Sequence, residues 1–234
     1  MEEEKQICCE KICEGGGLGE KPIDASLLIL AGGQGNRMGG ENKLYMKIGG
    51  SVLAEEIMTK LSPIFKETIV IVARGEKEQA LSLLKSLSVK DIRIEEDSVS
   101  GLGPLEGLRS GLAAMSGEWG FFIGCDMPSV DKTTVRLMYS QITDESDALC
   151  AEKDGYIEPL HAFYRKTCLG YVHSAIKLGH RKTKSFYPYI NLTVIKENDL
   201  ILSGGNTSSF LNLNTPCDLE KFQKEQCRKN ITSE

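Results

Sequence analysis

A glycine-rich segment from Gly32 to Lys43, which reads GGQGNRMGGENK, follows directly on the apolar run Leu27–Ala31. Glycine lets backbone N–H groups converge on an anion, and Arg37 and Lys43 add the positive charge that phosphate groups require. The segment therefore predicts a phosphate-binding loop whose cations could offset the charge on a leaving pyrophosphate. A Walker A loop needs Ser or Thr after its lysine, and Leu44 stands there. The glycine spacing does not match a dinucleotide-binding loop either.

Two acidic residues stand at the carboxyl ends of expected strands, which is where open α/β sheets bind ligands. Asp97 comes after the strand near Ile92–Glu95 and is followed by the segment GLGPLEG at 101–107. Its carboxylate could accept hydrogen bonds from the amino and imino groups of a purine, and the glycines would admit a base or ribose. Asp126 follows the apolar run Phe121–Cys125 and precedes Met-Pro. A single Asp at a strand end suits Mg²⁺ that is held jointly with phosphate oxygens.

Three further polar groups are candidates for the same site, although the asparagine pair could equally mark a turn. Asn212 and Asn214 stand two residues apart, so an extended run would place them on the same side. Either amide oxygen could complete a metal shell opposite the aspartate. The polar cluster Glu158–His161 could orient a substrate, and the basic cluster Gly179–Lys182 could bind a second phosphate.

Apolar runs rich in β-forming residues alternate with helical patterns along most of the chain, which predicts βαβ units. Continuous apolar strands separated by helices favour a mostly parallel, mixed sheet with helices on both faces, a three-layer α/β/α domain. The expected strands lie near Leu27–Ala31, Thr68–Ala73, Ile92–Glu95, Trp119–Cys125, Ala148–Ala151, His161–Tyr164 and Leu192–Lys196. The expected helices lie near Ser51–Leu61, Glu76–Leu87, Leu105–Met115, Lys132–Gln141 and Thr167–Leu178, with a final helix from Pro216.

Composition limits the classes of protein that fit. The chain has 234 residues with 41% hydrophobic content, which suits one domain, expected over residues 25–228. A formal net charge of −5 argues against a general nucleic-acid or anionic-membrane surface. No secretory signal or membrane-length apolar run occurs, so a cytoplasmic protein is expected. Residues 1–24, with Cys8, Cys9 and Cys13, are expected to form a flexible leader, and residues 229–234 a short tail.

The chain resembles the molybdenum cofactor guanylyltransferase family, the MobA type of nucleotidyltransferase, in six motifs taken in order. These are LAGGQGNRMGG-x-x-K, EDSVSGLGPLEGLRSGL, CDMP, EPLHAFY, GHR and NLNTPCDL, and they span about residues 26–225. Many sugar-phosphate and cofactor nucleotidyltransferases share the loop and CDMP, whereas LAGG, GPLEG and NxNTP point more narrowly to the guanylyl branch. The resemblance implies a Rossmann-like nucleotidyltransferase fold, also called the nucleotide-diphospho-sugar transferase fold.

The same resemblance implies a Mg²⁺-dependent transfer of GMP from GTP to the phosphate of molybdenum-bound molybdopterin, with release of pyrophosphate. Molybdoenzymes or their chaperones would be later partners. The implied nucleotide-binding residues are Leu30, Ala31, Gly32, Gly33, Arg37, Lys43, Asp97, Gly103, Gly107 and Asp126. Of these, Arg37, Lys43 and Asp126 would be catalytic, and Asp126 would bind the metal. The implied residues on the acceptor side are Arg181, Glu158, Asn212 and Asn214.

The chain differs from the family pattern at two places near these motifs. Asn42-Lys43 stands where the family usually has Asp-Lys, and Val72-Ala-Arg-Gly-Glu replaces an asparagine-bearing turn. One alternative is a related nucleotidyltransferase that uses CTP or acts on a sugar or alditol phosphate. A second alternative is a non-catalytic protein that binds nucleotide or finished cofactor and delivers it. Nucleotide preference separates the first alternative from the guanylyltransferase, and pyrophosphate release separates the second.

Overall fold

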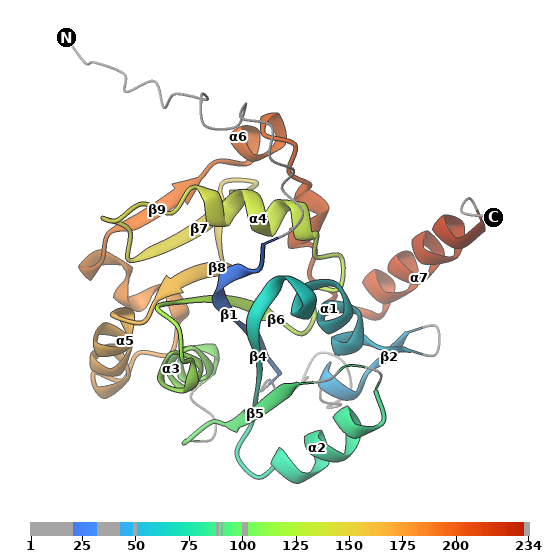
Figure 1. The fold of residues 1–234 in the computed structure, drawn as a ribbon, viewed down its shortest axis with the longest axis horizontal. Helices are drawn as coiled ribbons and strands as arrows, with labels where there is room; N and C mark the ends of the chain where they lie inside the picture. The colour runs from blue at the N-terminus through green and yellow to red at the C-terminus, as the bar shows by residue number, and fades with distance from the viewer. Residues whose placement is uncertain are drawn as a thin grey trace.

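The computed structural model of the chain describes residues 21–31, 43–48, 51–87, 89, 91–99 and 103–231. This part forms a seven-stranded sheet and a separate two-stranded ribbon (Figure 1). The strands of the sheet are β1 (Ile23–Leu30), β4 (Phe65–Val72), β5 (Ile92–Glu96), β6 (Trp119–Gly124), β7 (Ala148–Lys153), β8 (Tyr156–Arg165) and β9 (Leu192–Ile195). The ribbon consists of β2 (Lys47–Ile48) and β3 (Ser51–Val52).

Helices connect most of the strands. The α-helices are α1 (Leu53–Leu61), α2 (Lys77–Lys85), α3 (Pro104–Ala114), α4 (Lys132–Ser140), α5 (Cys168–Lys177), α6 (Glu197–Leu202) and α7 (Pro216–Ile231). Short 3₁₀ helices are η2 (Lys43–Tyr45), η3 (Ser62–Ile64), η4 (Thr183–Tyr189) and η5 (Thr207–Phe210). Among the described residues, none of the helices combines the length and the apolar character that crossing a membrane requires.

The strands lie across the sheet in the order β5-β4-β1-β6-β8-β7-β9. β1 pairs parallel with both β4 and β6, and β5 pairs parallel with β4. β8 runs antiparallel to both of its neighbours, β6 and β7, while β9 is parallel to β7. The prediction of a mostly parallel, mixed sheet between two helical layers is therefore confirmed.

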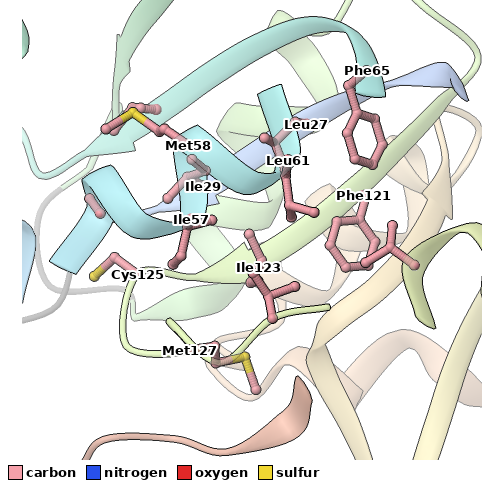
Figure 2. Close-up of a cluster of buried hydrophobic side chains, with 14 of the residues drawn as sticks. Leu27, Ile29, Ile57, Met58, Leu61, Phe65, Phe121, Ile123, Cys125 and Met127 are labelled. Carbon is pink, nitrogen blue, oxygen red and sulfur yellow. The ribbon is translucent and has the colours of Figure 1, made fainter. Parts of the chain in front are cut away.

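Two layers of apolar side chains hold the helices against the sheet, because successive strand residues point to opposite faces. In β1, Leu27 and Ile29 join the layer under α1, α2 and α4, whereas Leu28 joins the layer under α3 and α5. Figure 2 shows the first layer, in which Ile57 and Leu61 of α1 lie against the side chains of β1 and β6. Burial on both faces explains why these strands read as continuous apolar runs.

β7 and β8 form a hairpin that the alternation of strands and helices did not predict. Asp154 and Gly155 connect the two strands, and both have positive φ, 51° and 77°. This is the backbone geometry that two-residue hairpin turns favour. β8 begins at Tyr156, well before the strand expected near His161–Tyr164. Glu158 therefore lies within a strand of the sheet.

The ends of the domain and two inner segments differ from the expected boundaries. β1 begins at Ile23, which pairs with Phe65, so the sheet starts slightly before residue 25. α7 continues to Ile231, past residue 228. Residues 183–189 and 197–202, to which the sequence assigned no element, form η4 and α6. The leader cysteines Cys8, Cys9 and Cys13 lie outside the described residues.

Gly111 lies where α3 packs directly on the sheet. A Cβ atom there would be 2.6 Å from Cε1 of Phe122 and 3.4 Å from Cδ1 of Ile71. Phe122 is fully buried, so its ring has no free space to move into. We expect Gly111→Ala to lower the free energy of unfolding by about 1–3 kcal/mol in urea denaturation. The matched change Gly170→Ala on α5, where a Cβ meets nothing within 4 Å, should be neutral or stabilising by up to about 1 kcal/mol. Equal stability of the two variants would contradict the close packing of α3.

Candidate functional site

The carboxyl ends of β1, β4, β5 and β6 meet at one edge of the sheet. The N–H of Ala31 donates to the carbonyl oxygen of Ile71 on β4 at 2.8 Å. The N–H of Cys125 donates to the carbonyl oxygen of Leu30 at 3.1 Å. Leu30 and Ala31, two of the expected nucleotide contacts, thus lie between neighbouring strand ends. Open α/β sheets bind ligands at this edge, which makes it the candidate site.

The expected phosphate-binding loop lies outside the described residues. Gly32, Gly33 and Arg37 are therefore not placed, and only the backbone of Lys43 is described, as the first residue of η2. The described residues nearest to the loop, Ala31 on one side and Leu44 on the other, are both buried. Both sides of the loop are therefore joined to the core beside the end of β1.

Asp97 lies at the end of β5, where its N–H donates to the carbonyl oxygen of Val72 at 2.9 Å. The residue is only 8% exposed, and its Oδ1 atom has no hydrogen-bond partner among the described residues. Burial raises the pKa of the Asp97 carboxyl to about 6, although a hydrogen bond with Ser110 acts in the opposite direction. A buried acceptor without a donor is costly, so Oδ1 is suited to a ligand that donates to it.

Two glycines of the segment after Asp97 make close approaches at the same place. A Cβ atom on Gly107 would be 2.9 Å from Cδ2 of Leu30 and 3.9 Å from Oδ1 of Asp97. Gly103 has φ of 73°, which other residues rarely adopt, and its Cβ would be 3.8 Å from the carbonyl oxygen of Arg181. The structure therefore brings these five sequence-predicted residues together around the start of α3.

Asp126 follows β6 and forms the second part of the edge. A Cβ atom on Gly124 would be 2.5 Å from Oδ1 of Asp126, so the carboxylate folds back over this glycine. The carbonyl oxygen of Asp126 accepts a hydrogen bond from the N–H of Leu213 at 2.8 Å. This contact brings the segment before α7, far away in the sequence, to the end of β6.

Asn212 and Asn214 have different surroundings. Asn212 is half-buried, and its Nδ2 donates to Oε2 of Glu158 at 3.3 Å. Asn214 is exposed, and its backbone N–H donates to Asp218 in the first turn of α7 at 3.2 Å. Residues 211–214 belong to no strand, and the expectation that both amides project to the same side stays a prediction. The chain turns here into α7, and Asn212 is the asparagine that joins Glu158.

Glu158 reaches Asp126 through the pairing of two strands. β6 and β8 pair antiparallel up to Ile123 opposite His161, so the turn that carries Asp126 and the first half of β8, which carries Glu158, lie at the same end of the two strands. Burial raises the pKa of the Glu158 carboxyl, nearby hydrogen bonds act in the opposite direction, and the charge of Asp126 raises this pKa further. The two carboxylates are therefore close enough to repel each other.

This acidic pair fits a magnesium ion that is shared with phosphate groups. Mg²⁺ is commonly held by one or two carboxylates together with substrate phosphate oxygens. A divalent cation beside Asp126 and Glu158 would also relieve their repulsion. Nowhere in the described part of the chain do three or more His, Cys, Asp or Glu residues form a group that could hold a metal. Two carboxylates are the number of protein ligands with which Mg²⁺ commonly binds when phosphate oxygens complete its shell.

Some residues near the edge were missed by sequence reasoning. Lys184 on η4 lies close enough to Glu158 for its positive charge to lower the pKa of that carboxyl. The sequence feature that could have indicated Lys184 is its place directly after the basic cluster that contains Arg181. Glu106 and Arg109 lie beside Asp97, and the signal for them was their opposite charge at a spacing that places them on one face of a helix.

Residues 27–191, which include β1 and the ends of β4, β5 and β6, match the model of the MobA-like NTP transferase domain. The chain belongs to the MobA-like NTP transferase family. The match covers well over half of the chain and begins within β1. As a member of this family, the chain is a nucleotidyltransferase.

Individual relatives agree with this MobA-like assignment. A probable molybdenum cofactor guanylyltransferase from Peptoclostridium acidaminophilum is 30% identical over 205 residues, which cover 85% of this chain and 88% of the relative. The crystal structure of molybdopterin-guanine dinucleotide biosynthesis protein A from Archaeoglobus fulgidus matches with a TM-score of 0.73 and 29% identity, over 87% of this chain and 99% of that one. A 4-diphosphocytidyl-2C-methyl-D-erythritol synthase from Anaerococcus prevotii matches with a TM-score of 0.63 and 13% identity, over 88% of this chain and 98% of that one. The last likeness shows the fold alone, and together they confirm the nucleotidyltransferase fold.

Proposed function

We propose that this MobA-like protein transfers GMP from GTP to the phosphate of molybdenum-bound molybdopterin, forming molybdopterin guanine dinucleotide cofactor and releasing pyrophosphate. Relatives named as molybdenum cofactor guanylyltransferases support the proposal. The observation that carries it is the order of strand ends along the site edge. Asp97 follows β5, the expected phosphate-binding loop follows β1, and Asp126 follows β6. The base, the phosphates and the metal ion of one nucleoside triphosphate would bind in this order.

The proposed reaction needs no nucleophile from the protein. The acceptor phosphate is already an anion near neutral pH, so it would attack the α-phosphorus of GTP in line with the departing pyrophosphate. The protein would position the two substrates and offset the negative charge between them. Arg37 and Lys43 would hold the triphosphate, and Asp126, with Glu158 and Asn212 beside it, would hold the metal. Bound Mg²⁺ would supply charge neutralisation at the phosphate oxygens.

Two basic residues lie where the acceptor would approach. Arg181 is exposed, and its backbone lies next to Gly103 at the start of α3. Lys184 is also exposed and acts on Glu158 through its charge. Cationic side chains at this position would attract the acceptor phosphate. Asn214, at the end of the same edge, stays a predicted contact of the acceptor.

Release of pyrophosphate tests the proposed function. The protein is mixed with Mg²⁺, molybdenum-bound molybdopterin and either GTP, CTP or ATP, and pyrophosphate is measured over time. We expect release with GTP to be at least about 10-fold faster than with CTP or ATP, and to require the acceptor. Faster release with CTP would show a cytidylyltransferase, and release only with a sugar or alditol phosphate would show a different acceptor. Binding of GTP without release from any mixture would show a delivery protein.

The affinity for GTP should depend on the ionisation of Asp97. Burial raises the pKa of this carboxyl to about 6, so the carboxylate is charged above about pH 7 and accepts the donors of guanine. Below about pH 6 the affinity should fall roughly 10-fold per pH unit, because protonation removes the acceptor. Calorimetric titration with GTP across this range measures the effect. Asp97→Asn has no carboxyl to titrate, so its pH dependence of GTP affinity comes from the nucleotide phosphates alone. Identical pH profiles in both proteins would contradict the assignment of Asp97 to the guanine base.

A further inference from the structure

A partly buried ion pair on α3 lies beside Asp97 and has no part in the function proposed above. Glu106 is only 1% exposed. Arg109, one turn later, donates to both of its carboxylate oxygens, from Nε to Oε2 at 2.9 Å and from Nη2 to Oε1 at 2.7 Å. Two such hydrogen bonds fix the plane of the guanidinium group as well as its position. Arg109 is therefore held in one orientation.

Arg109 also contacts two serines near Asp97. Its Nη2 atom donates to Oγ of Ser98 at 2.8 Å and lies 3.5 Å from Oγ of Ser110. Ser110 in turn is hydrogen-bonded to Asp97. The guanidinium group thus contacts two serines beside Asp97, while Oδ1 of Asp97 keeps no partner among the described residues.

The charges that act on Asp97 come from α3. Besides burial, which has the largest effect, Glu106 raises the pKa of the Asp97 carboxyl and Arg109 lowers it. The neighbouring Glu96 is turned away, because its Oε1 accepts two backbone N–H groups at the start of α2, both at 3.0 Å. The ends of β1 and β4 that pack beside Asp97 are apolar. Apart from burial and the hydrogen bond with Ser110, the charges that shift the pKa of Asp97 thus belong to one acid and one base that bind each other.

We infer that Glu106 and Arg109 are positioning residues for base recognition: Glu106 holds Arg109 against Ser98 and Ser110, so Asp97 keeps one oxygen free for the base. The inference rests on the proposed function, because it assumes that a purine base binds at Asp97. Without Glu106 the guanidinium group can turn to Asp97 and occupy its free oxygen. Without Arg109 two buried carboxylates have no cation between them, so Asp97 takes up a proton more easily.

Stability alone does not account for this arrangement. Burying the Glu106 carboxylate costs desolvation free energy, which its attraction to the partly exposed Arg109 offsets, so the pair contributes little net stability. The arrangement also leaves the buried Oδ1 atom of Asp97 without a donor, which is unfavourable in the absence of a ligand. A ligand that donates to Asp97 explains both features.

Two variants that remove one charge each separate the roles of the pair. The affinities of the full chain for GTP and for ATP are measured by calorimetry with Mg²⁺ from pH 5 to pH 9. In Glu106→Gln we expect GTP binding at pH 8 to weaken about 10-fold, because Arg109 turns to Asp97. We also expect the midpoint, the pH at which half of the GTP affinity is lost, to move down. In Arg109→Gln we expect the midpoint to move up by about 1 pH unit with little change at pH 8. ATP affinity should stay within about twofold in both variants, since adenine lacks the guanine donors.

Two further variants serve as controls. Glu118→Gln removes the acid of another ion pair, in which Arg165 and Glu118 lie 3.2 Å apart at the opposite end of β6, and it should leave the midpoint unchanged. Arg109→Lys keeps the positive charge but loses the two-pronged contact with Glu106. Its midpoint should remain near that of the unmodified chain while GTP affinity falls. This variant tests the inference even where Arg109→Gln fails to fold.

The outcomes distinguish this inference from the proposed function. Unmoved midpoints in the charge-removing variants, or equal losses for GTP and ATP at every pH, would overturn the inference and leave the pair with a structural role. If the unmodified chain binds GTP no better than ATP, the proposed function fails instead. If the midpoint shifts in opposite directions in Glu106→Gln and Arg109→Gln, and does so for GTP binding but not for ATP binding, both the inference and the proposed function are supported.

Discussion

Replacing Asp126 by asparagine is expected to slow pyrophosphate release by about 100- to 1000-fold. The change keeps the size of the side chain but removes the charge that would hold Mg²⁺ next to the phosphates. The segment before α7 should stay in place, because Leu213 binds the backbone carbonyl of Asp126, at 2.8 Å, and not its side chain. The initial rate at saturating GTP, acceptor and Mg²⁺ measures the effect.

Asp144→Asn is the matched control for this prediction. Asp144 is exposed in the turn between α4 and β7, at the end of the sheet away from the candidate site. The same chemical change there should leave the rate within about twofold of the unmodified chain. A rate for Asp126→Asn as high as that of Asp144→Asn would contradict the proposed role of Asp126 at the metal ion.

The largest effect on stability is expected for Phe121→Ala. Phe121 is fully buried on β6, with its ring centroid 4.8 Å from that of Phe163, 5.0 Å from that of His161 and 5.8 Å from that of Phe65. Figure 2 shows Phe121 beside Phe65 in the layer that α1 covers. Alanine removes these contacts and leaves a cavity, so the free energy of unfolding should fall by about 3–5 kcal/mol. Urea denaturation followed by circular dichroism measures this value.

Tyr156→Ala provides the comparison on the surface. Tyr156 is also an aromatic residue in a strand, but it is 76% exposed. Its removal should change the free energy of unfolding by no more than about 0.5 kcal/mol. A loss below about 1 kcal/mol for Phe121→Ala would show that the aromatic cluster is not closely packed.

The central strands and the two aspartates of the site could be predicted from the sequence. Leu27–Ala31 and Phe121–Cys125 are continuous apolar runs, and they form the main part of β1 and β6 because helices cover both faces of the sheet. Asp97 and Asp126 each follow such a strand directly. Their position at the site edge depends only on the local order of strand and turn, because parallel strands place their carboxyl ends together.

Which residues join these aspartates was decided only by the tertiary structure. Glu158 lies near Asp126 because β8 runs antiparallel to β6, and no local pattern in the sequence encodes this direction. Asn212 reaches Glu158 through the turn into α7, and Arg181 lies against the start of α3. Residue type and position after a strand are local properties, so the sequence alone determined the glycine-rich segment after β1 and the two acids after β5 and β6. Contacts between distant segments depend on strand order, direction and register, which only the packing of the whole domain determines.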